Sequence, residues 1–402
     1  ADGLIDILTI RAGELDPQHP TSFTSSPECP APYLEDAAYI KAHAPKMTIC
    51  ASAGFQSLDL CEQVIAEGKA DMIAMARSWI CDPEYGKKAY EGRGEDVVPC
   101  IRCNKCHVPN DSDKFRSFCS VNPKIGMEFK LDQMIAPVGE KKKVAIIGGG
   151  PAGMEAAICL ADRGHEVILA EKNEHLGGAI NFAKYVPFKA DLDKFMNVLI
   201  RRVEDRKIKV MLNTTMTPEF AKQIKPDAIV MAIGAQPIVP PIPGIDGENT
   251  VMAIGMHEHM EDVKENVLIL GGGLVGCEEG IFLSQKGHNV TIVEMKPELC
   301  RDAPYLHHEA VLLELEKLGA KTYTNTRCVE VTSDGVVVEQ DGQKVKLTAD
   351  TVIVAAGVRA RVDEVETFRD CAEEFWVIGD CKQGRNVTAA IHEGYDAGTY
   401  IE

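Results

Sequence analysis

The sequence of 402 residues lacks the apolar run of ~20 residues that a membrane-spanning helix needs. Its first residues, ADGLIDILTI, lack the basic segment followed by an apolar stretch that marks a signal peptide. Basic residues are in the minority, with 43 Lys and Arg against 61 Asp and Glu, and the formal net charge is −18. Because such a surface repels nucleic acid, we expect neither a nucleic-acid-binding nor a membrane protein. Small ligands held in locally positive pockets are compatible with this charge.

The sequence also lacks the composition of a small secreted disulfide scaffold, which would be shorter and richer in loops. It is 45% hydrophobic and 26% charged, which is ordinary for globular proteins and, at this length, predicts about two to three domains. Ten of the fourteen cysteines are scattered singly, and we interpret them as reduced core thiols of a cytoplasmic protein. They are Cys29, Cys50, Cys61, Cys81, Cys159, Cys277, Cys300, Cys328, Cys371 and Cys381.

Residues 4–98 have the pattern of β/α repeats, which predicts a parallel sheet covered on both faces. The predicted strands are 4–10, 47–51 and 71–76, and the predicted helices are 33–43, 57–68 and 83–91. Three such units cannot close an eight-stranded barrel, and the chain enters its first strand almost at once, without a starting Met. We therefore expect that the first part of a longer polypeptide is missing; the alternative is a chain that begins here with a short open sheet.

Residues 143–172 predict a strand, a glycine-rich turn, a helix and a second strand that ends on an acid. Gly148, Gly150 and Gly153 form GxGxxG directly after the first strand. The first glycine makes the tight turn, the second lets the backbone approach a pyrophosphate, and the third lets helix and strand pack closely. The pyrophosphate then lies at the helix N-terminus, and Glu171 is placed to accept hydrogen bonds from an adenosine ribose.

Residues 266–295 repeat this pattern almost position for position, so the chain contains an internal duplication. The corresponding residues are Gly271, Gly273, Gly276 and Glu294. Glu294 favours NAD over NADP because its carboxylate would repel a 2′-phosphate, although Lys296 stands nearby. Two such units in one chain predict two bound dinucleotides.

Cys100, Cys103, Cys106 and Cys119 form the pattern CxxCxxC-x12-C. Zinc sites usually take their ligands from two separated pairs, although His107 offers a nitrogen ligand. Disulfides are a further interpretation, but no secretory signal accompanies them. Three cysteines at successive two-residue spacings suit one loop around a 4Fe-4S cluster, with the fourth ligand returning from further along the chain. We favour the 4Fe-4S cluster.

Further segments resemble flavoproteins in which an NAD domain is inserted within an FAD domain. Residues 229–244 and 352–357 are similar to the two crossover segments, and residues 375–394 to the closing FAD segment, in which an Asp binds the ribityl chain. No redox-active CxxC or CxxxxC follows residue 120, so electrons leaving FAD must go elsewhere. The resemblance implies NAD at the second turn and implies FAD contacts from Gly148, Gly150, Ala152, Gly153, Glu171, Lys172, Gly178, Gly234, Gly379, Asp380 and Thr388.

The whole order of segments is similar to the family of 2,4-dienoyl-CoA reductase, enoate reductase and trimethylamine dehydrogenase. In that family a TIM barrel of the Old Yellow Enzyme type binds FMN. Residues 70–93 resemble the segment whose strand end, with Ala-Arg, holds the FMN phosphate, and these positions are Ala76 and Arg77 here. Gly54 would offer backbone to the same phosphate, and the arginine adds a bidentate clamp.

The chain departs from that family near the expected FMN. Ala53-Gly54 stands where relatives often have Gly-Arg or Asn-Arg, so an arginine that would reach the flavin is absent, and Ser78 replaces a common proline. The proton donor, commonly a tyrosine, is expected in the missing part, so the catalytic residues stay unknown. Arg11 and His19 lie near the end of the first strand, where a substrate would bind, but we expect His19 to be a surface residue.

The fold predicted from all of this is α/β: the C-terminal part of a TIM (β/α)8 barrel, an iron–sulfur loop, and two Rossmann-like domains, the NAD domain inserted in the FAD domain. The expected boundaries are 1–98 for the partial FMN-binding barrel, 99–140 for the cluster loop and linker, 141–245 and 356–402 for the two parts of the FAD domain, and 246–355 for the NAD domain.

The predicted function is that of an NADH-dependent reductase. Electrons would pass from NADH through FAD, the 4Fe-4S cluster and FMN to an activated C=C bond of an enoate, dienoyl thioester or enone. The alternatives are an amine dehydrogenase that passes electrons to an external flavoprotein, and an electron-transfer subunit completed by another chain. We expect as partners a small-molecule substrate, NADH, further copies of the chain, and in the alternatives an electron-transfer protein or the missing barrel portion.

Overall fold

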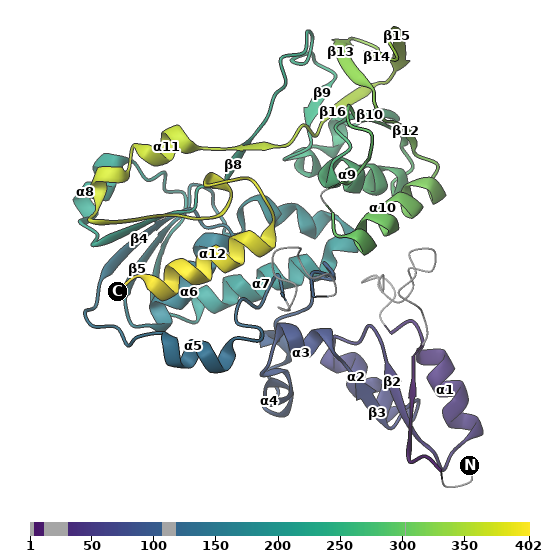
Figure 1. Cartoon of the computed structure of the whole chain (residues 1–402), viewed down its shortest axis with the longest axis vertical. Helices are drawn as coiled ribbons and strands as arrows, with labels where there is room; N and C mark the ends of the chain where they lie inside the picture. The colour runs from purple at the N-terminus through teal and green to yellow at the C-terminus, as the bar shows by residue number, and fades with distance from the viewer. Residues whose placement is uncertain (1–3, 12–30, 107–117, 302) are drawn as a thin grey trace. The chain divides into compact units, whose positions relative to one another are not determined.

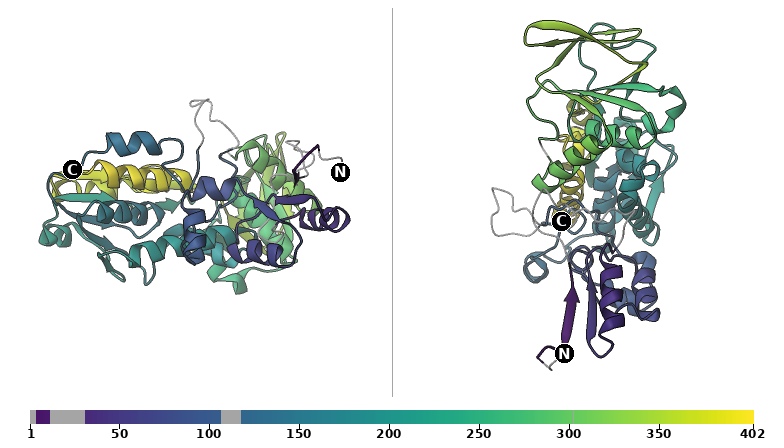
Figure 2. Two further views of the ribbon diagram at one scale, coloured as in Figure 1. Left: turned by 90° about the horizontal axis from the view of Figure 1, so that it is seen from below. Right: turned by 90° about the vertical axis from the view of Figure 1, so that its right-hand side faces the viewer.

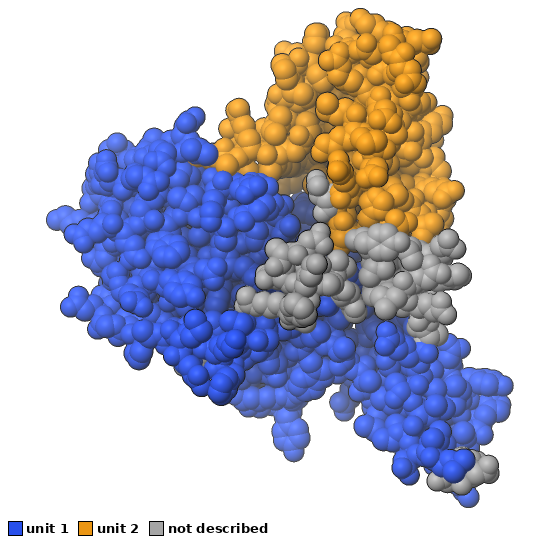
Figure 3. Space-filling model, viewed as in Figure 1, with its two compact units in different colours: residues 1–234, 362–402 blue, residues 235–361 orange. Residues whose placement is uncertain are grey.

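The computed structural model describes residues 4–11, 31–106, 118–301 and 303–402, so that His19 and His107 lie outside the described residues. The chain divides into two compact units (Figure 3). Unit 1 consists of residues 1–234 and 362–402, and unit 2 consists of residues 235–361. Unit 2 is therefore an insertion in the sequence of unit 1. No helix within the described ranges has the length and apolarity needed to cross a bilayer.

Unit 1 begins with a parallel sheet in the strand order β1-β2-β3. The central strand β2 is buried because Ile49 and Ala51 pack with Val64 of helix α2 in one apolar core. The bounds are β1 Ile7–Ile10, α1 Leu34–His43, β2 Thr48–Ser52, α2 Leu58–Ala66, β3 Met72–Ala74, α3 Arg77–Cys81 and α4 Tyr85–Tyr90.

The β/α repeats predicted over residues 4–98 are confirmed, with one addition. The strand expected to reach residue 76 ends at Ala74, and the short helix α3 follows it. The chain turns there because the Ile80 N–H donates to the Ala76 carbonyl at 3.1 Å and the Ser78 hydroxyl donates to the Phe55 carbonyl at 2.9 Å. Helix α3 therefore begins within the predicted Ala-Arg pair, with Ala76 as its N-cap and Arg77 as its first residue.

A second parallel sheet forms the centre of unit 1, in the order β18-β7-β4-β5-β6. Strand β18 comes from the end of the chain and pairs with β7, which returns residues 362–402 to this sheet. Helix α12 packs along α6 (Figure 1). The strands are β4 Lys143–Ile147, β5 Glu166–Ala170, β6 Ile208–Met211, β7 Ala228–Met231 and β18 Glu374–Val377, and the helices are α5 Glu128–Met134, α6 Pro151–Asp162, α7 Ala190–Glu204, α8 Pro218–Ile224, α11 Val362–Glu366 and α12 Val387–Tyr400.

Unit 2 repeats the parallel arrangement with the strand order β12-β11-β10-β16-β9. An antiparallel sheet of β13, β14 and β15 lies at one end of this unit (Figure 1 and Figure 2). The bounds are β8 Ala235–Pro237, β9 Thr250–Met252, β10 Asn266–Leu270, α9 Leu274–Gln285, β11 Asn289–Val293, α10 Tyr305–Lys317, β12 Lys321–Tyr323, β13 Arg327–Thr332, β14 Gly335–Gln340, β15 Gln343–Thr348, β16 Thr351–Val354 and β17 Val358–Ala360.

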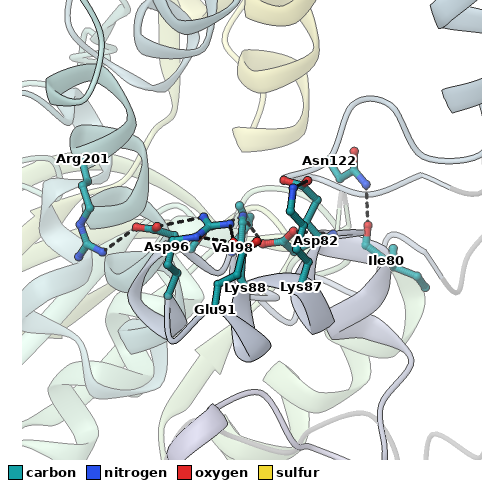
Figure 4. A network of polar contacts seen from close by, with 11 residues as sticks. Ile80, Asp82, Lys87, Lys88, Glu91, Asp96, Val98, Asn122 and Arg201 are labelled. Atoms are coloured by element: carbon teal, nitrogen blue, oxygen red, sulfur yellow. Dashed lines mark hydrogen bonds and ion pairs between the residues drawn. The ribbon is translucent and has the colours of Figure 1, made fainter.

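A polar network fixes the segment that follows α3 (Figure 4). The buried carboxylate of Asp82 accepts hydrogen bonds from Lys88 Nζ at 2.7 Å and from the Val98 N–H at 2.9 Å. Arg201 of helix α7 donates to the Asp96 carboxylate at 3.4 Å. The network thus connects the end of the first sheet to a helix of the second sheet. It also positions the start of the cysteine loop, the segment that carries Cys100, Cys103, Cys106 and Cys119.

The two neighbouring lysines of α4 provide a test of this network. Lys88 pairs with a side chain that is 4% exposed, whereas Lys87 pairs with Glu84 at the surface, where both side chains are more than half exposed. Because Lys88→Ala leaves a buried carboxylate without its cation, we expect the free energy of unfolding to fall by about 3–5 kcal/mol. Lys87→Ala should change it by at most about 1 kcal/mol. Urea unfolding followed by circular dichroism measures both, and equal effects would contradict a structural role for Asp82.

Candidate functional site

The first glycine-rich turn joins β4 to α6 in unit 1. Gly148 has a φ of 112°, and its N–H donates to the Ala170 carbonyl at 2.8 Å. A side chain there would collide with the Ala232 carbonyl, and a methyl group on Gly153 would collide with the carbonyl of Gly148. At Gly150, by contrast, an added Cβ would meet nothing within 4 Å. Two of the three glycines are therefore needed for the turn itself, while Gly150 leaves open space in front of the helix.

A buried carboxylate closes this turn. Glu171 Oε2 accepts from the Gly149 N–H at 2.8 Å, and its Oε1 accepts from the Asn173 N–H, also at 2.8 Å. The Glu171 side chain is buried just after the end of β5, at the position predicted from the sequence to accept hydrogen bonds from a ribose. Each carboxylate oxygen has a second lone pair, so Glu171 can fix the turn and still accept from a ligand hydroxyl. The bond to Gly149 was not predicted from the sequence.

Other residues predicted to contact FAD gather around the same turn. Gly178 has a φ of 58°, and a Cβ there would lie 3.1 Å from the Cα of Gly150. A Cβ on Gly379 would lie 3.1 Å from the Cβ of Ala152, so the closing segment of the chain returns to the N-terminus of α6. Asp380 accepts from a backbone N–H at 3.0 Å.

Two further predicted residues give less information about the turn. Lys172 is exposed, and Gly234 is the last residue of the first segment of unit 1. Gly234 has a φ of 69°, a conformation that favours glycine. Both assignments stay predictions.

The second glycine-rich turn, in unit 2, has the same geometry as the first. Gly271 has a φ of 113°, a methyl group on Gly276 would collide with the Gly271 carbonyl, and an added Cβ on Gly273 would meet nothing within 4 Å. Glu294 Oε2 accepts from the Gly272 N–H at 2.7 Å. The duplication visible in the sequence is thus a duplication of the turn and of its closing carboxylate.

The four cysteines of the CxxCxxC-x12-C pattern line one cavity in unit 1: Cys100, Cys103, Cys106 and Cys119. Within the described ranges every cysteine is a free thiol. Among the same residues, no group of three or more His, Cys, Asp or Glu side chains has the geometry of a metal site, so the cluster stays a prediction. Its donors do fit: apolar residues line the cavity beside the thiols, Ile80, Ile101, Phe118 and Val121 among them, and an iron–sulfur cluster takes thiolate ligands in such surroundings.

A fifth thiol, that of Cys81 at the end of α3, lines the same cavity. Its Sγ lies 3.7 Å from the Sγ of Cys119. The hydrogen bond from Cys81 lowers the pKa of Cys100 to about 6 and also lowers the pKa of Cys119. Burial, by contrast, raises the pKa of Cys103 and raises that of Cys106 to about 11. No local signal in the sequence marks Cys81, because the other cysteines of this cavity begin only at Cys100.

A second pocket, of ≈ 300 Å³, adjoins the cysteine cavity. It contains the predicted phosphate contacts Gly54, Ala76 and Arg77, and the predicted substrate-facing Arg11. Ala53, which also lines it, and Gly54 both have a φ of 77°, an uncommon conformation for an alanine that often marks a functional site. Arg77 and Cys100 line both the pocket and the cavity. The two predicted sites therefore share a wall.

A junction around Asp191 of α7 positions the cysteine loop. Arg102 Nε donates to Asp191 Oδ2 at 2.5 Å, and Gln56 Nε2 donates to the same oxygen at 3.1 Å. Gln56 Oε1 in turn accepts from the Cys100 N–H at 2.7 Å. Arg102 also lines the second pocket. The sequence missed all three contacts, because each joins segments far apart along the chain.

The predicted FAD contact Thr388, in the first turn of α12, lies next to the cysteine loop. Its Oγ1 is 2.6 Å from the hydroxyl of Ser120, which lines the cysteine cavity. In unit 1 the cysteine loop therefore lies beside one residue of each of the two predicted flavin sites, Thr388 of the FAD site and Arg77 of the FMN site.

Comparison with known proteins adds to this geometry. Residues 142–394 match the family described as pyridine nucleotide-disulphide oxidoreductase. The chain is 36% identical over 351 residues to an NADH oxidase of Thermoanaerobacter brockii, covering 85% of this chain and 54% of the relative. It is 32% identical over 348 residues to a cinnamate reductase of Clostridium sporogenes, covering 85% of this chain and 51% of the relative. The chain thus spans about half the length of these curated relatives.

The fold matches a solved structure of 2-naphthoyl-CoA reductase in complex with 2-naphthoyl-CoA. The TM-score is 0.91 and the sequence identity is 31%, and the match covers 99% of this chain and 60% of that one. The match includes the first sheet as well as the two Rossmann-like arrangements, so the predicted α/β fold class, with part of a TIM barrel, is confirmed.

Two glycines of the first turn offer variants that separate an effect on ligand binding from an effect on stability. Gly153→Ala places a methyl group on the Gly148 carbonyl, and we expect it to lower the free energy of unfolding by about 1–3 kcal/mol. Gly150→Ala fits the extended backbone, with a φ of −76°, and should cost less than about 1 kcal/mol.

Gly150→Ala should nevertheless lower the amount of bound dinucleotide, because its methyl group occupies the space that the pyrophosphate needs. Thermal unfolding and the absorbance of the bound cofactor per chain measure the two effects. An unchanged cofactor content in Gly150→Ala would show that Gly150 has no role in ligand approach.

Proposed function

Because the chain belongs to the pyridine nucleotide-disulphide oxidoreductase family, we propose that it is part of an NADH-dependent flavin and iron–sulfur reductase of activated C=C bonds. When bound, FAD, a 4Fe-4S cluster and FMN would supply the electron path from NADH to that bond. The protein's own residues bind these groups, orient them and exclude water from them.

The observation that carries this proposal is the shared wall between the cysteine cavity and the second pocket. Cys100 and Arg77 line both, so a group held by the cysteines would be a direct neighbour of a group held in the pocket. On the other side, Thr388 of α12 contacts Ser120 of the cysteine cavity. This arrangement supports a cluster that stands between two flavins.

We assign the two dinucleotides to the two glycine-rich turns. In unit 1 the turn at Gly148, with Glu171 and the returning Gly379 and Asp380, would hold FAD. In unit 2 the turn at Gly271 would hold NADH by its pyrophosphate. Gly273, Gly276 and Glu294 would also contact the NADH. The N–H groups at the start of α6 and α9 provide favourable partners for these anionic groups.

The second pocket would hold the FMN phosphate. Gly54 and Ala76 would offer backbone to it, and the guanidinium group of Arg77 would add positive charge in a chain of net charge −18. The cluster would be held by the four thiolates of Cys100, Cys103, Cys106 and Cys119.

The substrate class rests on the relatives. One is named a cinnamate reductase and another a 2-naphthoyl-CoA reductase. Both names denote conjugated carboxylic acids or thioesters, which supports an enoate, dienoyl thioester or enone as the substrate of the protein to which this chain belongs.

Anaerobic mixing with NADH tests the proposed electron donor. We expect NADH to bleach the flavin absorbance of the purified protein in a stopped-flow experiment, because the second glycine-rich turn, in unit 2, would bind NADH as the electron donor. If NADH fails to bleach the flavin while dithionite succeeds, the NADH-dependent reductase is wrong, and an amine dehydrogenase remains.

Replacement of one cysteine tests the relay. We expect Cys103→Ser to lower the iron and acid-labile sulfide content and to lower substrate reduction by NADH by more than the about 10–100-fold that is lost when a group supporting a metal ligand is removed. NADH should still bleach FAD, because the first turn is untouched. Cys328→Ser, in strand β13 of unit 2, is the control and should leave iron content and activity unchanged. Full activity in Cys103→Ser would contradict the relay.

A further inference from the structure

Ser120 connects a predicted cluster ligand to helix α12. Its hydroxyl oxygen lies 3.0 Å from Cys103 Sγ and 2.6 Å from Thr388 Oγ1. Ser120 is 2% exposed, so water does not compete for these contacts. The result is a continuous chain of three polar side chains that runs from the cysteine cavity to the first turn of α12.

Helix α12 is held at a fixed position for this contact. Asn386 caps the helix by accepting from the Ala389 N–H at 3.1 Å. One turn further on, His392 Nε2 lies 2.8 Å from the Cys119 carbonyl and must donate to it, because a carbonyl oxygen only accepts. The helix therefore contacts the cysteine loop at two points, beside Ser120 and beside Cys119.

A bound metal group would fix the direction of the hydrogen bonds in this chain. A cysteine sulfur that ligates iron has lost its proton and can only accept a hydrogen bond. Ser120 must then donate its only hydroxyl proton to Cys103. Its oxygen is left as the acceptor for Thr388, whose hydroxyl donates at 2.6 Å. Hydrogen bonds in such a chain strengthen one another in buried surroundings.

We propose that Ser120 and Thr388 are positioning residues that raise the reduction potential of the cluster held by Cys103. The proposal rests on the function proposed above, and assigns to these two hydroxyls a role that the cysteine pattern does not reveal. A hydrogen bond donated to a ligand sulfur stabilises the more negative, reduced form of the cluster, and such bonds are among the factors that set cluster potentials. Thr388 acts through Ser120, because Ser120 is the residue that contacts the sulfur.

The test is a potentiometric titration of the complete, cofactor-loaded protein, followed by the electron paramagnetic resonance signal of the reduced cluster. We expect Ser120→Ala to shift the midpoint potential to more negative values. The expected change is roughly three- to tenfold in the ratio of oxidised to reduced cluster, where tenfold corresponds to about 59 mV for one electron. Ser120→Thr keeps a hydroxyl and should restore the wild-type potential.

Thr388→Val should cause a smaller shift in the same direction. Because Thr388 acts through Ser120, the double variant Ser120→Ala/Thr388→Val should shift the potential no further than Ser120→Ala alone. Thr399→Val is the matched control, since Thr399 is a buried threonine further along the same helix. It should leave the potential unchanged.

The possible results separate this proposal from the proposed function. Wild-type protein without iron and sulfide would refute the cluster itself. A loaded Ser120→Ala protein with unchanged potential would refute only the role of Ser120, and additive shifts in the double variant would refute the action of Thr388 through it. If Ser120→Ala fails to load the cluster, Thr388→Val decides, and an unchanged potential there overturns the proposed chain.

Discussion

The arrangement of unit 1 depends on one buried carboxylate, that of Asp191. It lies on helix α7 of the second sheet and accepts from Arg102 of the cysteine loop and from Gln56, which follows strand β2 of the first sheet. Three segments that are distant along the chain therefore meet at one charge. Removing Arg102 would cost less than the about 3–5 kcal/mol of a fully broken buried pair, because Lys194 also pairs with the Asp191 carboxylate at 3.3 Å. This junction holds the loop that carries Cys100 against the first sheet and helix α7.

The two glycine-rich turns show how far a local pattern determines a site. Both turns have nearly the same φ at the first glycine of GxGxxG and the same lack of space at the third. In both, the residue after the first glycine donates its N–H to a carboxylate at the end of the next strand. Glu171 and Glu294 were predicted as ribose acceptors. Their bonds to Gly149 and Gly272 add a structural role, so replacement of either acid would affect the turn as well as the ligand.

Most of the fold could be predicted from the sequence, because its signals are local. Apolar strands, helix periodicity and glycine spacing predicted the parallel sheets and the duplicated turn, and the fold class is confirmed, as is the family that the sequence resembles. The missing elements depend on distant contacts. The strand was predicted to reach residue 76, and helix α3 was not predicted, because the bond from Ser78 to the Phe55 carbonyl cannot be recognised in a single segment. Cys81 was predicted as an isolated core thiol, although α3 brings it to 3.7 Å from Cys119.

The cysteine loop shows why these distant contacts matter for chemistry. Arg102 and Asn104 have φ values of 56° and 55°, a region in which side-chain-bearing residues are strained by about 1–3 kcal/mol each. Such strain persists only where the surroundings impose it. Here Asp191 holds the side chain of Arg102, and Arg77 donates to Asn104 Oδ1 at 3.3 Å.

The same strained backbone places the Arg102 N–H 3.4 Å from the sulfur of Cys100. One sulfur of the loop thus accepts from the backbone while another, that of Cys103, has the hydroxyl of Ser120 beside it. The helix α7, the first sheet and the helix α12 each contribute one of the contacts that produce this environment. A sequence pattern can identify the four cysteines, but the hydrogen bonds that their sulfurs receive follow from the packing of these three elements around them.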